Sequence, residues 1–334
     1  MRALILAACF WLAVAPLHAG ELEDRKAISD QIAADLERSD FAAIEKRYAQ
    51  ALAGETRLAS GIFVANRIAR TLLSGVWKAA PTGVKLAHGQ DELWNPVEEK
   101  LQRWAAQFPR SALPAIALSN AYTAHGWAYR GNGMADTVAK EDWVKLEHYL
   151  GKAQEALVSR REAGEKDPNW WREMIEMARV RGWPGEQFNA VSVKAMDAFP
   201  GHYDIYFEIG LALLPKWGGS MEQVAAFMDD AVRRTRQTEG ESLYGRIYWS
   251  LTGNMTEREK RHPLLPWSKV RAGLNDVVQR YPDSWNMNSF ARMACEAGDK
   301  PTAFSLLARI EGSVVEPAWH SRAQLQRCRN WAAE

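Results

Sequence analysis

The chain has 334 residues, of which 47% are hydrophobic and 25% are charged, and its formal net charge at pH 7 is +1. This composition excludes intrinsic disorder, because it supplies enough apolar residues for a sizeable core. The balanced charge, without any basic run, argues against nucleic-acid binding and against a polybasic membrane anchor. The remaining function classes depend on the predicted elements and on a few unusual residues.

The first twenty residues have the pattern of a secretory signal peptide. Arg2 precedes an apolar run at residues 3–15, and the small residue Ala19 stands where cleavage would occur. The run is too short to span a bilayer, and no later run is longer. We therefore expect cleavage near Ala19 and a periplasmic or secreted protein without a membrane span. An alternative is lipidation of Cys9, because the letters LAAC resemble a bacterial lipobox; the apolar run continues past the cysteine, which favours cleavage.

Beyond this leader, nearly every segment has the apolar spacing of an amphipathic helix, and almost none alternates as a strand does. The clearest stripes lie at residues 97–108, 143–157, 171–178 and 188–199. Two of these helices are predicted to begin at Asn95-Pro96 and at Asp167-Pro168, since a capping residue followed by proline is typical of a helix start. The sequence therefore predicts an all-α fold.

Residues 213–227, LLPKWGGSMEQVAAF, predict a helical hairpin. Pro215 cannot continue the first helix, because proline lacks the amide donor. The two glycines permit a tight turn. Ser220 is then expected to cap the second helix. This interpretation explains every residue of the turn except Trp217.

Helix pairs recur along the chain. Pro168 and Pro200 are 32 residues apart, which matches a two-helix repeat of the tetratricopeptide kind. In the clearest unit, FARMACEAGDKPTAFSLLARI, Ala291, Ala303 and Leu307 occupy the positions where such helices approach closely. We predict a tetratricopeptide-like α-solenoid of antiparallel helix pairs, in one domain over residues 20–334, with C-terminal repeats and a cap at 267–332.

Three short motifs occur in a characteristic order. They are WAYRGNGMADTV from Trp127, DPNWWREMIEMAR from Asp167 and LLPKWGGS from Leu213. Together they resemble the bacterial tetratricopeptide-like proteins grouped as domain of unknown function 4034, over residues 40–238. The resemblance implies a helical-repeat fold, and it supplies neither an activity nor catalytic residues.

The titratable residues predict no catalytic residue, metal site or cofactor. The six histidines beyond the leader lack metal-ligand spacing, and His125 is interpreted as a satisfied histidine near a helix end. Glu173 with Glu176, and Asp204 with Glu208, are spaced to share a helix face, where paired carboxylates can do acid–base work if a cleft buries them. We interpret both pairs as parts of solvated faces.

Two cysteines remain beyond the leader, Cys295 and Cys328, 33 positions apart. An oxidising compartment allows them to form a disulfide. The alternative is two separately buried thiols, because 33 residues is close to one repeat period. Pairing is the favoured interpretation.

Tryptophan is unusually frequent, with 15 in the chain and 14 without Trp11 of the leader. Those expected in the core are Trp104, Trp143 and Trp171. Those beside glycine or proline turns are Trp127, Trp183 and Trp217. An indole at a turn can anchor a peptide or stack on a sugar, or it can fold back over the helix ends.

The sequence thus predicts a non-catalytic protein–protein interaction module that binds another protein or a peptide on the inner helices and turns. The residues assigned to this surface are Tyr129, Arg130, Lys216, Trp217, Trp127 and Trp183. The alternative is a cell-envelope glycan-binding protein or glycan-acting enzyme, with Glu173 or Asp204 as acid or base. A cleft that joins a tryptophan to a carboxylate of raised pKa would favour this alternative.

Overall fold

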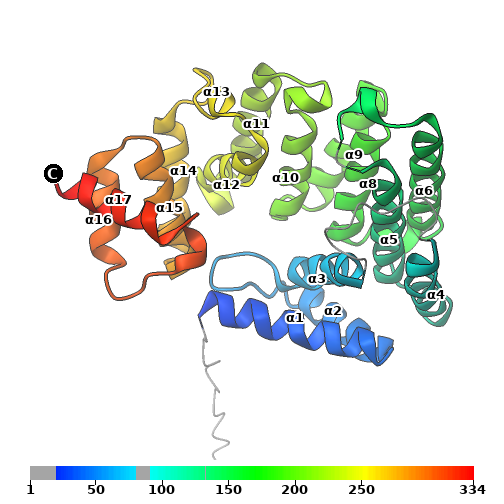
Figure 1. The fold of residues 1–334 in the computed structure, drawn as a ribbon. Coiled ribbons are helices and arrows are strands. Elements are labelled where there is room, and N and C mark those ends of the chain that lie inside the picture. The colour runs from blue at the N-terminus through cyan, green and yellow to red at the C-terminus, as the bar shows by residue number, and fades with distance from the viewer. Residues whose placement is uncertain (1–19, 80–90, 132) are drawn as a thin grey trace, which may run out of the picture.

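The computed structural model describes residues 20–79, 91–131 and 133–334 (Figure 1). The predicted signal peptide, its cleavage position and Cys9 lie outside these residues. None of the described helices is both long enough and apolar enough to cross a membrane.

The predicted all-α class is confirmed, because the described residues form helices joined by turns, with a single isolated bridge between Arg57 and Phe63 and no strand. The first half contains α1 (Glu21–Glu37), α2 (Phe41–Ala53), α3 (Val64–Ala79), α4 (Asp91–Gln107), α5 (Leu113–Arg130), η1 (Ala135–Thr137), α6 (Lys140–Val158), α7 (Arg161–Gly164), α8 (Pro168–Val180) and α9 (Gly185–Ala198). The second half contains α10 (Tyr203–Ala212), η2 (Pro215–Trp217), α11 (Met221–Glu239), α12 (Ser242–Leu251), η3 (Thr252–Asn254), α13 (Glu257–Lys260), α14 (Trp267–Arg280), α15 (Ser284–Glu296), α16 (Lys300–Arg309), η4 (Glu316–Ala318) and α17 (Arg322–Ala333).

Side-chain capping explains the starts of several helices. The Asp167 side chain accepts the amide of Asn169 at the start of α8, and that of Ser220 accepts the amide of Gln223 at the start of α11. The start predicted at Asn95 is wrong, because α4 begins at Asp91 and contains Pro96 in its interior. The extra turn contains Trp94, which is buried in the core. The free energy gained by burying this side chain outweighs the local preference for a helix start before proline.

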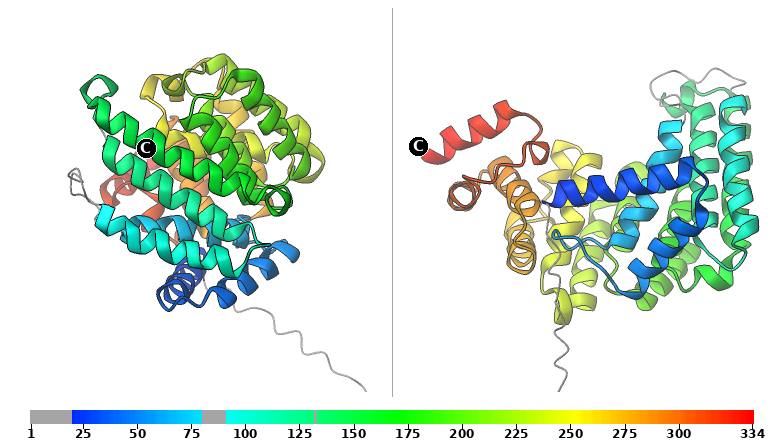
Figure 2. Two further views of the ribbon diagram at one scale, coloured as in Figure 1. Left: turned by 90° about the vertical axis from the view of Figure 1, so that its right-hand side faces the viewer. Right: turned by 90° about the horizontal axis from the view of Figure 1, so that it is seen from below.

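Helices α4 to α17 form a curved row of neighbouring helices, and α1 to α3 lie together along one edge of it (Figures 1 and 2). Within the row, α5 packs on α6, α8 on α9, α12 on α14, and α15 on α16. Ala291 and Ala303 are fully buried on the last of these pairs, where a larger side chain would hold the helices apart.

The N-terminal segment is docked on the starts of helices that come much later in the chain. The hydroxyl of Tyr48 on α2 donates to both oxygens of Asp167, at 2.8 and 2.9 Å. The carbonyl of Ser60 accepts hydrogen bonds from Arg246 on α12, at 2.8 Å, and from Asn286 on α15, at 3.2 Å. Residues of the N-terminal segment therefore contact the N-terminal ends of α8 and α15 and the middle of α12.

A single glycine shapes the docked loop. Gly61 has φ of +88°, which favours glycine, and a Cβ there would lie 2.8 Å from both Arg246 and Tyr281. Arg57 reaches back from the same loop and donates to the hydroxyl of Tyr203 at 2.7 Å. The loop thus fits closely between α10, α12 and the residues that precede α15.

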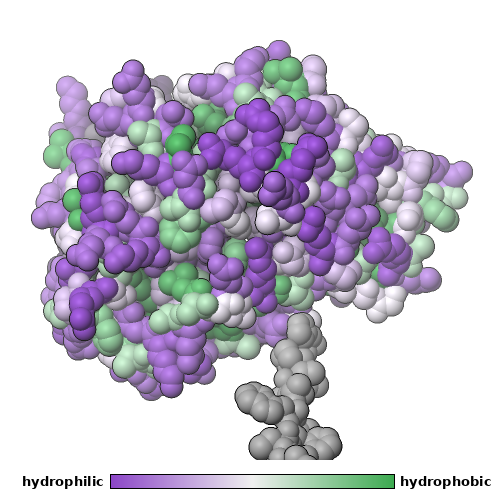
Figure 3. All heavy atoms as spheres, turned by 180° about the vertical axis from the view of Figure 1, so that it is seen from behind, coloured by the Kyte–Doolittle hydropathy of each residue, from purple (hydrophilic) through white to green (hydrophobic). Residues whose placement is uncertain are grey.

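One connected hydrophobic core runs through the described residues from Ile32 to Cys328, with Trp94, Trp104 and Trp170 among its largest buried side chains. Hydrophilic side chains cover most of the face seen in Figure 3, and apolar ones occur there in small groups. A binding site must therefore be sought in the local shape and charge of the surface.

Candidate functional site

The predicted interaction residues lie at the C-terminal ends of their helices, away from the edge that α1 to α3 cover (Figure 1). Tyr129, Arg130 and Trp127 belong to the last turn of α5, Trp183 follows α8, and Lys216 and Trp217 form η2 after α10. Each has intramolecular contacts, which decide how much of it is free to bind.

Trp217 is held by an arginine. The guanidinium of Arg179 lies 4.3 Å from the centre of the Trp217 ring and also donates to Glu208 at 2.8 Å. Lys216 donates to Asn254 at 2.6 Å. The turn itself needs glycine, since Gly218 has φ of +89°. PKWGGS is thus a helix-to-helix turn in which the tryptophan also has a structural partner, although 37% of Trp217 stays exposed.

The end of α5 is covered in a similar way. Arg130 lies 5.5 Å from the ring centre of Trp127 and 5.3 Å from that of Trp143, and it donates to the carbonyls of Gly131 and Gly133. Trp143 is 39% exposed, so its predicted core position is wrong: it covers the guanidinium at the end of the neighbouring helix. Trp183 is half-buried against the core.

His125 lies in the most polar cluster of the interior. Its Nδ1 is 2.6 Å from Glu98 and its Nε2 is 3.0 Å from Asp91, both on α4. The hydroxyls of Tyr129 and Tyr149 donate to the same Asp91 oxygen. The hydrogen bond from Tyr129 lowers the pKa of Asp91, whereas burial raises the pKa of both tyrosines.

The cluster encloses its histidine, whereas the Asp91 side chain at its edge is 39% exposed. His125 is 1% exposed, and the rings of Trp94 and Tyr149 stack on it. Lys152 also pairs with Glu98 at 3.0 Å. Among the described residues, no group of three acidic, histidine or cysteine side chains could hold a metal ion. The arrangement orients α4, α5 and α6, and buried polar groups satisfied in this way fix how helices pack.

Three of the four carboxylates that we predicted on solvated helix faces, Glu173, Asp204 and Glu208, are buried, and Glu176 is half-buried, so that interpretation is wrong. Glu173 pairs with Arg172, and Asp204 pairs with Arg70 and accepts from Asn66 at 2.6 Å. Burial opposes ionisation of Asp204, but the Arg70 guanidinium outweighs it and holds the pKa of this carboxyl below its usual value. An anion held by an arginine in this way is a poor general acid at neutral pH.

Glu208 is the carboxylate closest to the predicted glycan arrangement. Burial, and then the charge of Glu176, raise its pKa, and Arg179 connects it to Trp217. The arginine lies between the carboxylate and the ring, so the two do not face a common open space.

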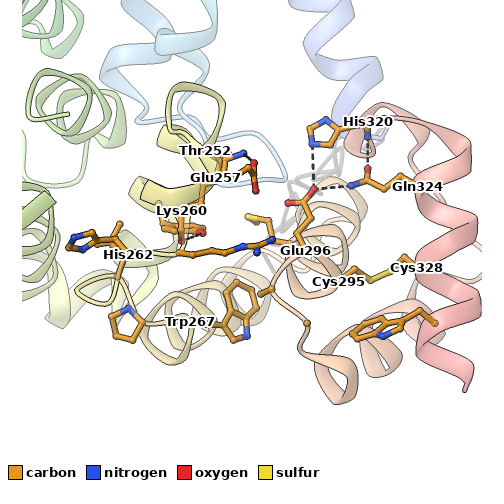
Figure 4. A pocket seen from close by; sticks show the side chains of 18 of the residues that line it. Thr252, Glu257, Lys260, His262, Trp267, Cys295, Glu296, His320, Gln324 and Cys328 are labelled. Atoms are coloured by element: carbon orange, nitrogen blue, oxygen red, sulfur yellow. Dashed lines mark hydrogen bonds and ion pairs between the residues drawn. A yellow bond between two sulfur atoms is a disulfide. The ribbon is translucent and has the colours of Figure 1, made fainter. Parts of the chain in front are cut away.

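The structure has a groove of about 1120 Å³ that the sequence analysis did not identify (Figure 4). One wall consists of the end of α12, α13 and the residues leading into α14; the other consists of the end of α15 together with α17. Trp267 and Trp331 line it and are half-buried. A disulfide between Cys295 and Cys328, whose Cα atoms are 5.9 Å apart, ties α17 to α15 at this site.

Internal pairing leaves the groove with unpaired positive charge. Lys260 pairs with Glu257 at 2.7 Å. Glu296 accepts hydrogen bonds from Arg292, at 2.8 Å, and from Gln324, at 2.9 Å. Two further arginines are exposed in the lining and form no hydrogen bond or ion pair with any described residue. They are Arg261, which follows α13, and Arg327 on α17.

These lining residues were missed because they share no sequence motif. Arg261 and Arg327 stand on different helical units, and only the tertiary fold brings them to one groove. The excess of tryptophan was the available signal, but proximity to a glycine or proline turn does not select the groove tryptophans: Trp267 opens a helix and Trp331 lies near the end of one.

Comparisons with known proteins do not identify this chain: no family model matches it, and neither a curated protein nor a solved structure shows significant similarity. The resemblance to domain of unknown function 4034 therefore stays a prediction.

Proposed function

We propose that this chain is an exported, tetratricopeptide-like α-solenoid that binds another polypeptide without catalysis, in the groove between α13–α14 and α15–α17. The main support is that two half-buried tryptophans and two arginines without an ion pair to any described residue line the same groove. Arginine and tryptophan are the side chains that most often anchor protein–protein contacts.

The boundary of the groove supports a polypeptide ligand. Its volume of about 1120 Å³ is close to that of small-molecule pockets, which usually enclose about 300–1,000 Å³ and bury most of the ligand, but this groove lies open between separate helical units. The N-terminal segment already contacts the opposite edge through Tyr48 and Ser60. In the proposed solenoid, this leaves the C-terminal ends of the later helices for the partner.

A glycan-binding or glycan-acting role is the second candidate, and the cluster of Trp217, Arg179 and Glu208 is the observation that favours it. We rank it lower because Arg179 covers a face of the ring and holds the carboxylate. In the groove, the Lys300 ammonium lies 5.9 Å from the ring centre of Trp331, which restricts stacking of a sugar there.

Export is tested by the mass of the protein recovered from cells. Cleavage near Ala19 produces a mature chain that begins at or near Gly20 in the extracytoplasmic fraction. A chain that keeps residues 1–19 in the cytoplasm would contradict the export part of the proposal.

Polypeptide binding is tested by photo-cross-linking from inside the groove. p-Benzoylphenylalanine replaces Gln324, which lines the groove, and in a matched control it replaces Gln326, an exposed residue on the same helix outside the lining. The proposal predicts a cross-linked polypeptide from position 324 that is absent from position 326. Equal cross-linking from both positions, or none from either, would overturn it.

A further inference from the structure

The charge left in the groove points to the chemistry of the partner. We infer that the bound polypeptide is an acidic, extended segment whose carboxylates pair with Arg261 and Arg327 and which places an apolar side chain between Trp267 and Trp331. This inference rests on the proposed function, because it names the ligand of the same groove.

The acidic residues of the groove already have partners within the protein. Glu257 pairs with Lys260 and Glu296 with Arg292, so neither attracts a cationic ligand strongly. The Glu257 carboxylate also interacts electrostatically with Arg261, but these two described residues form no ion pair. Arg261 and Arg327 form no hydrogen bond or ion pair with the described residues. A guanidinium binds a carboxylate with two parallel hydrogen bonds, and such charge-assisted bonds are about twice as strong as neutral ones.

The positions of the arginines favour an extended ligand. Arg261 follows α13 on one wall, and Arg327 belongs to α17 on the other. Successive side chains of an extended peptide point to opposite sides. Acidic residues an odd number of positions apart therefore reach both walls at once.

The tryptophans favour an apolar side chain over a sugar. The indole N–H of Trp267 already donates to Asp299 at 2.7 Å, so this ring keeps only apolar surface for a ligand. Trp331 is half-buried and has Lys300 near its face. Partly covered rings contact an aliphatic or aromatic side chain well, whereas a pyranose requires a broad open face.

The test is selection of a displayed library of random ten-residue peptides on the immobilised mature chain, followed by fluorescence anisotropy with the enriched peptides. The disrupting variant is Arg261→Gln with Arg327→Gln. The matched control is Arg258→Gln with Arg329→Gln, which removes the same charge from α13 and α17 outside the groove lining. An oligogalacturonate probe of similar charge represents the acidic glycan.

The inference predicts enriched peptides with at least two Asp or Glu residues and one large apolar residue. Their Kd should rise about ten-fold or more in the disrupting variant, as expected for loss of hydrogen bonds to charged groups, and less than about two-fold in the control. Neutral or basic peptides that depend on the groove would overturn the acidic inference but keep the proposed function. Peptide binding that is unchanged in the disrupting variant would likewise overturn only the acidic inference. Binding of the oligogalacturonate without enrichment of any peptide would overturn both.

Discussion

Removal of the disulfide should loosen the end of the chain that forms one wall of the groove. α17 buries only Leu325, Cys328 and Ala332, so its packing alone holds it weakly. Cys295 and Cys328 close a loop with a sequence separation of 33 residues. The loop-entropy relation assigns a cross-link of this length about 3.7 kcal/mol of the free energy of unfolding at 25 °C.

The assay compares urea unfolding of the wild type with that of the double variant Cys295→Ser, Cys328→Ser. We expect the variant to lose about 3–4 kcal/mol and the reduced wild type to match it, while reductant leaves the variant unchanged. Because helical arrays can open locally, hydrogen exchange of the variant should be faster than that of the wild type in α17 and should change less in α8 and α10. A loss below about 1 kcal/mol, with α17 as protected as in the wild type, would refute the reasoning.

Three further substitutions test other parts of the structure. Burial raises the pKa of Asp167 from 3.8 to about 6, so the folded state favours the protonated carboxyl. Protonated Asp167 therefore contributes about 3 kcal/mol to the free energy of unfolding below pH 4, and this contribution is lost as the pH rises through 6. In urea titrations, Asp167→Asn should therefore gain stability relative to the wild type across that window; a difference independent of pH would contradict this. His125→Phe removes the nearest hydrogen-bond partner of buried Glu98, which keeps Lys152, and should lower the free energy of unfolding by about 1–3 kcal/mol, whereas an unchanged urea midpoint would show that the cluster contributes little. Trp217→Leu removes the contact with Arg179 and should cost about 0.5–2 kcal/mol while the affinity for groove peptides stays constant. If this variant bound the groove peptides ten-fold more weakly, the binding surface would include the turn that holds Trp217.

The parts of the fold that depend on neighbouring residues were predictable. Asp167 and Ser220 cap helices where their side chains predicted, because an N-cap needs only an amide two or three residues ahead. The wrong start at Asn95 shows the limit of this reasoning, since burial of Trp94 extends the helix through a proline. Tertiary packing decided that boundary.

The candidate site was much less predictable, because burial and charge depend on distant partners. The sequence spacing alone places Asp204 on a helix surface, whereas in the fold it pairs with Arg70 from a helix near the N-terminus. Docking of Ser60 on α12 and α15 likewise has no local signal, and neither has the groove that joins Arg261 to Arg327. Sequence spacing identified helix faces, but it could not show which faces other segments cover.

Hydrogen–deuterium exchange with and without an enriched groove peptide tests the central claim most directly. The proposed function predicts that the peptide slows exchange of amides at residues 252–267 and 320–331, on the two walls, and leaves residues 127–139 and 213–220 unchanged. Protection confined to those two turns would contradict it, because the partner would then bind the helix-end tryptophans. Protection in neither region would show that the groove does not bind the peptide.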